Sequence, residues 1–335
     1  MIGYLLHKLV LAIPTVIGAS IIVFLGVRTV PGDPVQMMLG EVGATGQNLE
    51  RLRAELGLDA PVTVQYAHFV TRSLRGDFGR SLQDGDTVLS DIRAAFPATA
   101  ELAFAALALA CVAGTAVGIV SALKQFSVFD NVLRVLVLIG VSMPIFWSGL
   151  LLLLTLGLSL KLFPLGGRLS DTIALHRVTG AYVLDSLVQG NWPALRDSAL
   201  HLVLPAVTLA TGPVAIIARM TRSAMLEVLR QEYIVTARSK GLDAKAVVLR
   251  HALKNALNPV VTVVGLQIGF LLGGTVVTET VFDWPGMGRL AVDSILYRDY
   301  PVVQGIVLLA VVIFVGINLL VDTLYAYLDP EIRLA

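Results

Sequence analysis

The chain has 335 residues, of which 56% are hydrophobic and 15% are charged, and its formal net charge at pH 7 is +1. With a mean hydropathy of +0.79, this composition excludes a soluble domain built around a large core and indicates an integral membrane protein. The single cysteine, Cys111, excludes a disulfide bond within the chain.

Six apolar windows each come close to the roughly 20 residues that a helix needs to cross a bilayer. They lie at 9–28, 98–122, 132–158, 202–221, 260–280 and 302–321. None shows the alternating pattern of a lipid-facing barrel strand. We therefore predict an all-α polytopic membrane protein with six transmembrane helices.

The first window predicts an uncleaved anchor rather than a signal peptide. It is longer than the apolar core of a signal peptide, and its short basic flank, His7 and Lys8, favours a cytoplasmic N-terminus. Six spans then place the C-terminus in the cytoplasm as well. Charge supports this orientation only in part, because cations lie on the predicted inside at 123–131 and 222–259 but also in the outer connector at 160–200.

Residues 29–97 form the largest predicted extramembrane region. Within it, PGDP at 31–34 predicts a turn after the first span, and 47–57 predicts a short amphipathic helix. The predicted parts of the chain are an N-terminal helix with a periplasmic region (1–93), a transmembrane core (94–324) and a cytoplasmic tail (325–335).

Small residues form a stripe on two predicted spans. They are Gly265, Gly269 and Gly273 on the fifth span, and Ala110, Gly114 and Gly118 on the second. Such a ridge lets another helix approach closely. The approaching helix can belong to the same bundle or to a second subunit, and the ridge can also line a path. In the third span, Pro144 and Gly149 are predicted to interrupt the helix.

Polar side chains gather on the fifth span, with Gln267 near its middle and Thr275, Thr278 and Glu279 towards its outer end. A carboxylate at the edge of a span is costly unless it faces water or a partner. We predict that these four residues belong to a transport pathway or its outer gate. For Glu279 the alternative is an interfacial position in water or an ion pair with Arg289.

The sequence lacks the motifs of common catalytic sites. It has no GxxxxGK[ST] phosphate loop, no GxSxG and no HExxH, and its five histidines lack metal-ligand spacing. We therefore predict no catalytic residue, no metal site, no cofactor and no enzymatic activity in this chain.

The connector at 222–259 concentrates the positive charge. Between Arg219 and Asn258 there are eight Lys or Arg and three Asp or Glu, a net of +5. By the positive-inside rule this connector lies in the cytoplasm. Its charge suits either a protein partner that docks on it or contact with anionic lipids.

Local spacing predicts that this connector is a bent pair of helices. A first helix runs from Glu227 to Lys240 and ends at Gly241 in the left-handed region. Asp243 is the predicted N-cap of a second helix, which Pro259 stops near the next span.

The connector resembles the cytoplasmic coupling loop of ABC importer permeases, which is written EAA-x3-G-x9-I-x-L-P. Gly241 occupies the glycine position and Leu253 the leucine position. Val235–Ala237 occupy the E-A-A positions, and Lys254 stands where the proline would be. The departures agree with the peptide-importer variant, which reads much like EYIVTARSKGL followed by RHALKNALNPVVTVVGLQ.

Further blocks resemble the same branch of the family along nearly the whole chain. They are IPT at 13–15, PGDP at 31–34, ELGLD at 55–59, GDFGRSL at 76–82, SMPIFW at 142–147, RMTRSAMLEVL at 219–229, TETVFDWPGMGR at 278–289 and RDYPVVQG at 298–305. The chain is similar to the first of the two permease subunits of dipeptide and oligopeptide ABC importers, the dipeptide permease B type of the binding-protein-dependent transport family.

The resemblance implies a type I ABC importer permease fold with a periplasmic insertion after the first helix, in the bacterial inner (plasma) membrane. It implies a heterodimer with a second permease subunit, two ABC ATPase subunits that hydrolyse the ATP, and a periplasmic or lipid-anchored peptide-binding protein. The chain would form half of the pathway for dipeptides or short peptides, within membrane lipids and with no nucleic-acid partner. The same branch also includes importers of glutathione and nickel complexes.

Carried onto this sequence, the resemblance assigns roles to particular residues. Those that would seat in the ATPase are Ala237, Arg238, Lys240, Gly241, Leu242 and Asp243. Residues 29–97 and 283–301 would meet the binding protein. A stand-alone ion-coupled carrier or channel is the alternative, although it would need more charged residues inside the spans.

Overall fold

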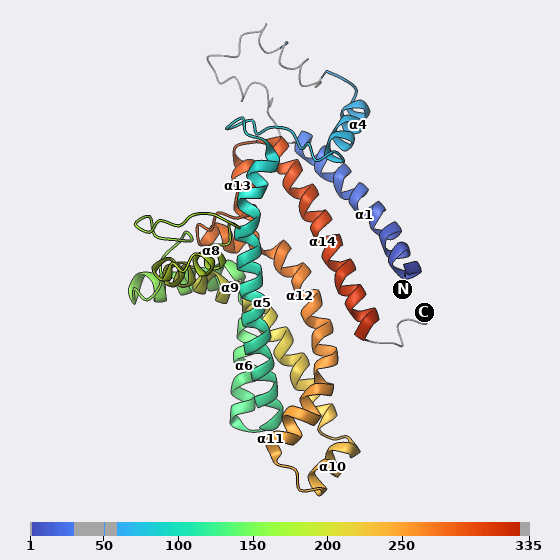
Figure 1. The fold of residues 1–335 in the computed structure, drawn as a ribbon, viewed down its shortest axis with the longest axis vertical. Coiled ribbons are helices and arrows are strands. Elements are labelled where there is room, and N and C mark those ends of the chain that lie inside the picture. Colours follow the sequence, from blue (N-terminus) through green and yellow to red (C-terminus); the bar gives the residue numbers. More distant parts are fainter. Residues whose placement is uncertain (1, 30–49, 51–58, 329–335) are drawn as a thin grey trace. The chain divides into compact units, whose positions relative to one another are not determined.

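The computed structural model describes residues 2–29, 50 and 59–328, and these form a helical protein (Figure 1). Among them the pairing of Arg80 with Thr87 is an isolated β-bridge outside any strand. The amphipathic helix predicted at 47–57 lies outside the described residues except for Glu50. The all-α fold class is confirmed.

Most of the helices follow one another closely along the chain, but a long connector at 160–181 separates η1 from α8. In chain order they are α1 (Ile2–Thr29), α4 (Val62–Ser73), α5 (Val88–Leu123), α6 (Val128–Ser142), α7 (Ile145–Leu152), the π-helix η1 (Leu153–Ser159), α8 (Tyr182–Val188), α9 (Trp192–Val228), α10 (Glu232–Ser239), α11 (Ala244–Ala246), the π-helix η2 (Val247–Ala252), α12 (Leu253–Val281), α13 (Met287–Leu296) and α14 (Tyr300–Leu328).

Four helices of the described chain are long and apolar enough to cross a membrane by themselves. They are Val10–Thr29, Val88–Leu123, Trp192–Val228 and Tyr300–Val321. Two bent pairs, Val128–Ser142 with Ile145–Ser159 and Ala244–Leu271 with Thr275–Val281, pass the same test together. The number of candidate spans is therefore four, or up to six if each bent pair is one span, as the sequence predicts.

The third predicted span is broken at Pro144, as predicted. α6 and the pair of α7 and η1 meet at an angle of 108°, because Met143 and Pro144 adopt extended backbone with ψ of 131° and 133°. Gly149 does not interrupt the helix, so that part of the prediction is wrong. It lies inside α7, where an added Cβ would come within 3.2 Å of Phe282 and Thr208.

The fifth span also departs from the prediction at one point. Pro259 was predicted to stop the helix that follows Asp243, but the helix continues through it from Ala244 to Leu271. Neighbouring helices and local π-helical turns allow proline inside membrane helices. Here η2 lies just before α12, and Ala256 and Val260 are buried on either side of Pro259.

The chain divides into two compact units. Unit 1 consists of 1–98 and 285–316, and unit 2 of 99–284 and 317–335. In unit 1, Val88 and Ile92 at the start of α5 pack against Val302 and Ile306 of α14. The buried Asp299 carboxylate accepts hydrogen bonds from Ser81 Oγ at 2.6 Å and from the Leu82 N–H at 3.0 Å, which ties the loop before α5 to the start of α14.

α9 is the central helix of unit 2, and α6, α7, α8 and α12 all pack against it. The small residues of the second span meet the same helix. A Cβ on Gly118 would lie 2.5 Å from Thr221 Cβ and 2.7 Å from the Ala218 carbonyl oxygen, and one on Gly114 would lie 2.9 Å from Ile217 Cβ. The sequence left open whether this stripe packs inside the bundle, packs against a second subunit or lines a path. For Gly114 and Gly118 the structure shows packing inside the bundle, against α9.

Gly118→Ala is expected to lower the free energy of unfolding by about 1–3 kcal/mol, because the new methyl group has no room between α5 and α9. Thermal unfolding of the purified protein in detergent measures this. Gly140→Ala in α6 is the control, since no atom lies within 4 Å of its Cβ position. Equal melting temperatures for the two variants would contradict the close approach.

Candidate functional site

The basic connector folds into an elbow, defined here as residues 229–246. α9 ends at Val228, and α10 starts only at Glu232, after the turn at 229–231. The prediction of one helix from Glu227 to Lys240 is therefore wrong at its start. In Figure 1 the elbow lies at the lower end of unit 2.

Gly241 makes the bend of the elbow, as the sequence predicts. Its φ is +77°, which is costly for any residue with a side chain. The Gly241 N–H donates to the Arg238 carbonyl at 2.9 Å and the Leu242 N–H to the Ala237 carbonyl at 3.4 Å, the two bonds of a Schellman helix end. The Asp243 carboxylate then accepts a hydrogen bond from the Lys245 N–H at 3.2 Å, which confirms it as an N-cap.

Apolar packing holds the elbow against the membrane helices. Ile234 and Ala237 of α10 are buried in a cluster with Met225, Val247 and Ala256. A second tie is the hydrogen bond that Asn255 Nδ2 on α12 donates to the Tyr233 hydroxyl at 2.7 Å. The elbow is thus fixed to α9 and α12, so a force on α10 is transmitted to both helices.

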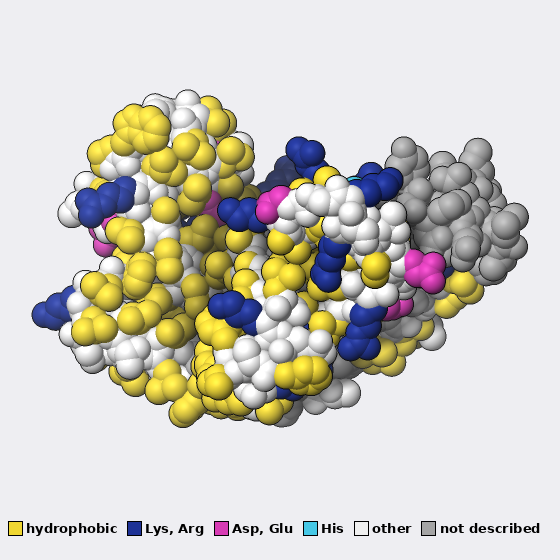
Figure 2. Space-filling model, turned by 90° about the horizontal axis from the view of Figure 1, so that it is seen from below, with side chains coloured by type: hydrophobic (Ala, Val, Ile, Leu, Met, Phe, Trp, Pro, Cys, Tyr) yellow, Lys and Arg dark blue, Asp and Glu magenta, His cyan; other side chains and the backbone are white. Residues whose placement is uncertain are grey.

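The outer surface of the elbow is polar, basic and partly apolar. Arg238, Lys240, Leu242 and Asp243 are exposed, whereas Ala237 faces inward. Sequence reasoning missed Val235 and Leu249, which are 57% and 59% exposed beside them. Figure 2 views the molecule from this end and shows more Lys and Arg than Asp and Glu. Exposed apolar side chains with adjacent cations are typical of a protein-docking surface.

The predicted pathway residues on α12 lie inside unit 2. Gln267, Thr275, Thr278 and Glu279 are all buried, and Glu279 has no exposed surface. Thr99 Oγ1 on α5 donates a hydrogen bond to Glu279 Oε1 at 2.7 Å. This burial does not fit an interfacial carboxylate in water.

The glycine ridge of the fifth span is only partly described. Gly265 and Gly269 are buried in α12, which fits a close helix approach. Gly273 is in the same helix, but its surroundings lie outside the described part of the structure.

A buried carboxylate, which sequence reasoning missed, joins three helices next to the elbow. Asp130 of α6 is fully buried and accepts hydrogen bonds from Arg222 Nε at 3.0 Å and Nη2 at 2.9 Å. It also accepts from Ser121 Oγ and from the Phe126 N–H. The sequence offered one local signal, an Asp three residues after the N-cap Ser127. The partner of this Asp, Arg222, lies 92 residues further along the chain, so local spacing could not reveal the pair.

A second buried ion pair lies at the opposite end of unit 2. Arg168 Nη2 donates to Glu101 and to the Gly180 carbonyl, and its guanidinium lies 3.9 Å from the Tyr182 ring. Glu101 also accepts a hydrogen bond from the Val183 N–H at 2.7 Å. These contacts fix the connector between η1 and α8 onto α5.

Asp185 organises the same connector. Burial would raise the pKa of its carboxyl group, but hydrogen bonds from the Thr179 hydroxyl and from the Thr179, Gly180 and Val178 N–H groups outweigh this effect and hold the pKa below its usual range. Asp185 is therefore an ionised structural centre of the connector.

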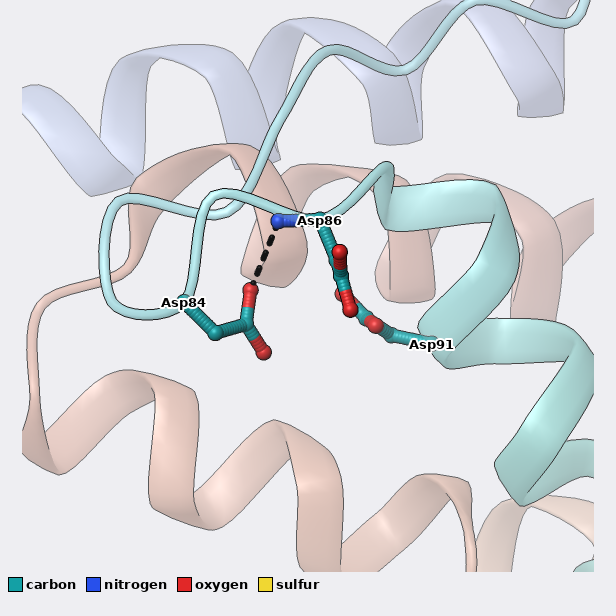
Figure 3. Close-up of side chains that lie close together, drawn as sticks. All are labelled: Asp84, Asp86 and Asp91. Carbon is teal, nitrogen blue, oxygen red and sulfur yellow. Dashed lines mark hydrogen bonds between the residues drawn. The ribbon is translucent and has the colours of Figure 1, made fainter.

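Three carboxylates gather in unit 1 around the start of α5 (Figure 3). Ligand oxygens of Asp84, Asp86 and Asp91 lie within 4.8 Å of one another. The Asp86 N–H donates to Asp84 Oδ1 at 3.0 Å, and Asp91 is in the first turn of α5, where the helix dipole favours an anion. Asp84 and Asp86 thus form the turn before α5, and Asp91 stabilises the start of that helix.

Comparison with known proteins decides the family. Residues 114–334 match the family described as "Binding-protein-dependent transport system inner membrane component". The chain belongs to this family. Residues 1–103 match the corresponding N-terminal family of membrane components.

Relatives of this permease match it from end to end. The dipeptide transport system permease protein DppB of Escherichia coli (strain K12) is 45% identical, over 99% of this chain and 99% of that protein. The di/tripeptide transport system permease protein DppB of Pseudomonas aeruginosa (strain UCBPP-PA14) is 44% identical over 99% of each chain. The glutathione transport system permease protein GsiC of Pectobacterium atrosepticum (strain SCRI 1043) is 40% identical over 99% of each.

The permease is thus a multi-pass inner-membrane protein with the fold of an ABC importer permease. It is the transport component of such a system, and its family works together with other permease, ATPase and binding-protein components. Neither the described residues nor these relatives favour a stand-alone carrier or channel.

Proposed function

We propose that this permease forms half of a translocation pathway for dipeptides or short peptides, driven by ATP that separate subunits hydrolyse. The observation that carries the proposal is the end-to-end identity of 44–45% with dipeptide and di/tripeptide permeases. The glutathione permease is 40% identical, and glutathione is itself a small peptide, so its import is compatible with the same pathway.

The proposed assembly has four kinds of component. The chain pairs with a second permease subunit, two ABC ATPases bind in the cytoplasm, and a periplasmic or lipid-anchored binding protein delivers the peptide. Both termini and the elbow then face the cytoplasm. In this assembly the binding protein contacts residues 29–97 and 283–301. The proposed division of the chain is an N-terminal helix with a periplasmic region (1–93), a transmembrane core (94–324) and a cytoplasmic tail (325–335).

The elbow is the proposed contact with an ATPase. Arg238, Lys240, Leu242 and Asp243 are exposed there and would seat in the groove of the ATPase, while Gly241 sets the bend. Ala237 supports the elbow from its buried side. When ATP closes the ATPase pair, movement of α10 would pass through its apolar contacts to α9 and α12 and change access to the pathway.

Peptide uptake by a deletion strain tests the proposed function. The strain expresses the transporter with or without its binding protein and is offered di-, tri- and longer peptides. We expect uptake that requires the binding protein and ATP, together with co-purification of an ATPase and a second permease. Uptake that follows an ion gradient in a chain purified alone would support the carrier instead.

Glu279→Gln tests the proposed role of the polar cluster. Gln retains an acceptor for Thr99 Oγ1 but removes the charge, so a contact with the peptide amine or an outer gate should weaken. A hydrogen bond to a charged group contributes about 1.5–3 kcal/mol, so we expect peptide-stimulated ATP turnover and uptake to fall by about tenfold or more.

Thr99→Val is the complementary control, because it removes the Thr99–Glu279 hydrogen bond, which Glu279→Gln retains, and it leaves the charge of Glu279 in place. It should retain most of the uptake. If Glu279→Gln transports as well as the wild type, Glu279 only stabilises helix packing.

A further inference from the structure

A cavity of about 880 Å³ lies inside unit 2 and extends to the first residues of the elbow, Arg230 and Gln231. It is lined by the last turns of α5, the middle of α6, the last turns of α9 and the turn after α9. Four arginines line it, Arg134, Arg219, Arg222 and Arg230, against a single lining acid, Glu227. This arginine cavity has no role in the coupling that we propose for the elbow.

Two of its arginines share one carboxylate, and the other two form no ion pair in the described part of the chain. Arg222 is held by Asp130, and Arg134 Nε lies 3.6 Å from the same carboxylate. Arg219 and Arg230 are exposed, and within the described part of the chain neither makes an ion pair. With Asp130 and Glu227 counted, four cations meet two anions, so the cavity keeps a net charge of about +2.

On two of the lining helices, α5 and α6, the wall of the cavity changes from polar to apolar. On α6, Arg134 is followed one turn later by Val137 and Leu138; on α5, Ser121 is preceded by Val117. The α9 side of the cavity stays basic: Arg219 follows Ala218, and Arg230 lies in the turn just after Val228, where α9 ends. The apolar wall continues onto the exposed face of α6, where Leu138 is 60% exposed. This gradient fits a ligand with an anionic head and a long apolar tail.

A peptide fits the arginine cavity less well than such an amphiphile. A dipeptide has an ammonium group for every carboxylate, and the net positive charge of the lining opposes the ammonium. Glu227 is the one acidic lining residue that could accept a hydrogen bond from this ammonium group. Nothing in a dipeptide backbone would cover the apolar wall on α5 and α6.

We propose that the arginine cavity binds an anionic phospholipid of the cytoplasmic leaflet, with the headgroup attracted by the two unpaired cations Arg219 and Arg230 and an acyl chain along α6. The inference rests on the orientation given under the proposed function, which puts the ends of α5 and α9 at the cytoplasmic surface. Anionic lipids attract basic side chains at that surface. Basic pockets between membrane helices are known to take such headgroups.

Lipid binding to the complete purified transporter tests this. The complex is delipidated in detergent, titrated with dioleoyl phosphatidylglycerol or with dioleoyl phosphatidylcholine, and examined by native mass spectrometry. We expect the wild type to retain phosphatidylglycerol in preference to phosphatidylcholine. The double variant Arg219→Gln/Arg230→Gln should bind it about 25-fold more weakly, about fivefold for each arginine. Arg196→Gln, at the other end of α9 and outside the cavity, should bind like the wild type.

Three results would overturn the proposal. The double variant could bind phosphatidylglycerol like the wild type, a dipeptide could displace the lipid, or only the isolated chain and not the complex could bind it. The last result would mean that another subunit covers the cavity. Because the readout is lipid retention, it is independent of peptide uptake: failure to transport peptides would leave the lipid result intact, and the reverse also holds.

Discussion

Gly241→Val is expected to reduce peptide uptake by at least about tenfold while the protein still inserts and folds. The left-handed conformation at φ +77° costs a residue with a side chain roughly 1–2 kcal/mol, and more when the residue is β-branched. No atom lies within 4 Å of the added Cβ, so the strain is confined to the backbone. The chain relieves it by changing the bend, which moves Leu242 and Asp243 away from their positions on the elbow.

A graded series separates this conformational effect from simple loss of glycine. Asn tolerates the left-handed region better than other residues, so uptake should fall in the order Gly241→Asn, Gly241→Ala, Gly241→Val. The measurements are uptake in a deletion strain, ATP turnover of the purified complex and the amount of ATPase that co-purifies. Insertion is followed by the yield of monodisperse protein.

Gly190→Val is the matched control for the elbow. Gly190 has a φ of +64° and no atom within 4 Å of its Cβ position, so the backbone strain is similar, but it lies between α8 and α9. It should retain uptake that Gly241→Val loses. If Gly241→Val transports normally, the elbow does not couple ATP hydrolysis to transport.

The elbow could be predicted from the sequence because local signals determine most of it. A glycine after a helical run and an Asp before the next one act within four residues of themselves, and both were placed correctly at Gly241 and Asp243. The break at 229–231 was missed, since Gln231 has no strong capping signal. The helix end predicted at Pro259 was wrong, because burial of Ala256 and Val260 outweighs the local preference of proline to end a helix.

Burial and long-range pairing limit what the sequence can predict for the rest of the site. The polar residues of α12 were found by their position in an apolar span, but only the fold reveals that Glu279 is fully buried beside Thr99. Asp130 and Arg222 are 92 positions apart, so no spacing rule relates them. The stripe of Gly114 and Gly118 predicted a close approach, whereas its partner, α9, follows only from the packing.

Asp130→Asn is expected to lower the free energy of unfolding by about 3–5 kcal/mol, because it leaves the Arg222 charge without its buried partner. The new amide also points N–H groups at positions where Arg222, Ser121 and the Phe126 N–H already donate. Chemical denaturation of the purified complex in detergent, or its melting temperature, measures the effect. Ser121→Ala removes a neutral hydroxyl that donates to Asp130 and accepts from Arg222 Nε, and it should cost about 1.5–3 kcal/mol, less than Asp130→Asn.

The exposed pair of Arg72 and Asp77 gives the matched control. Their side chains are 60% and 53% exposed at an N···O distance of 2.9 Å, and pairs of this kind contribute well under about 1 kcal/mol. Asp77→Asn should therefore leave stability almost unchanged, although the shortest N···O distance in its pair equals the 2.9 Å between Asp130 and Arg222. The double variant Asp130→Asn/Arg222→Gln should recover part of the loss, because it also removes the uncompensated charge. If Asp130→Asn is no less stable than Asp77→Asn, Asp130 does not hold α5, α6 and α9 together, and the elbow must be supported by its apolar cluster alone.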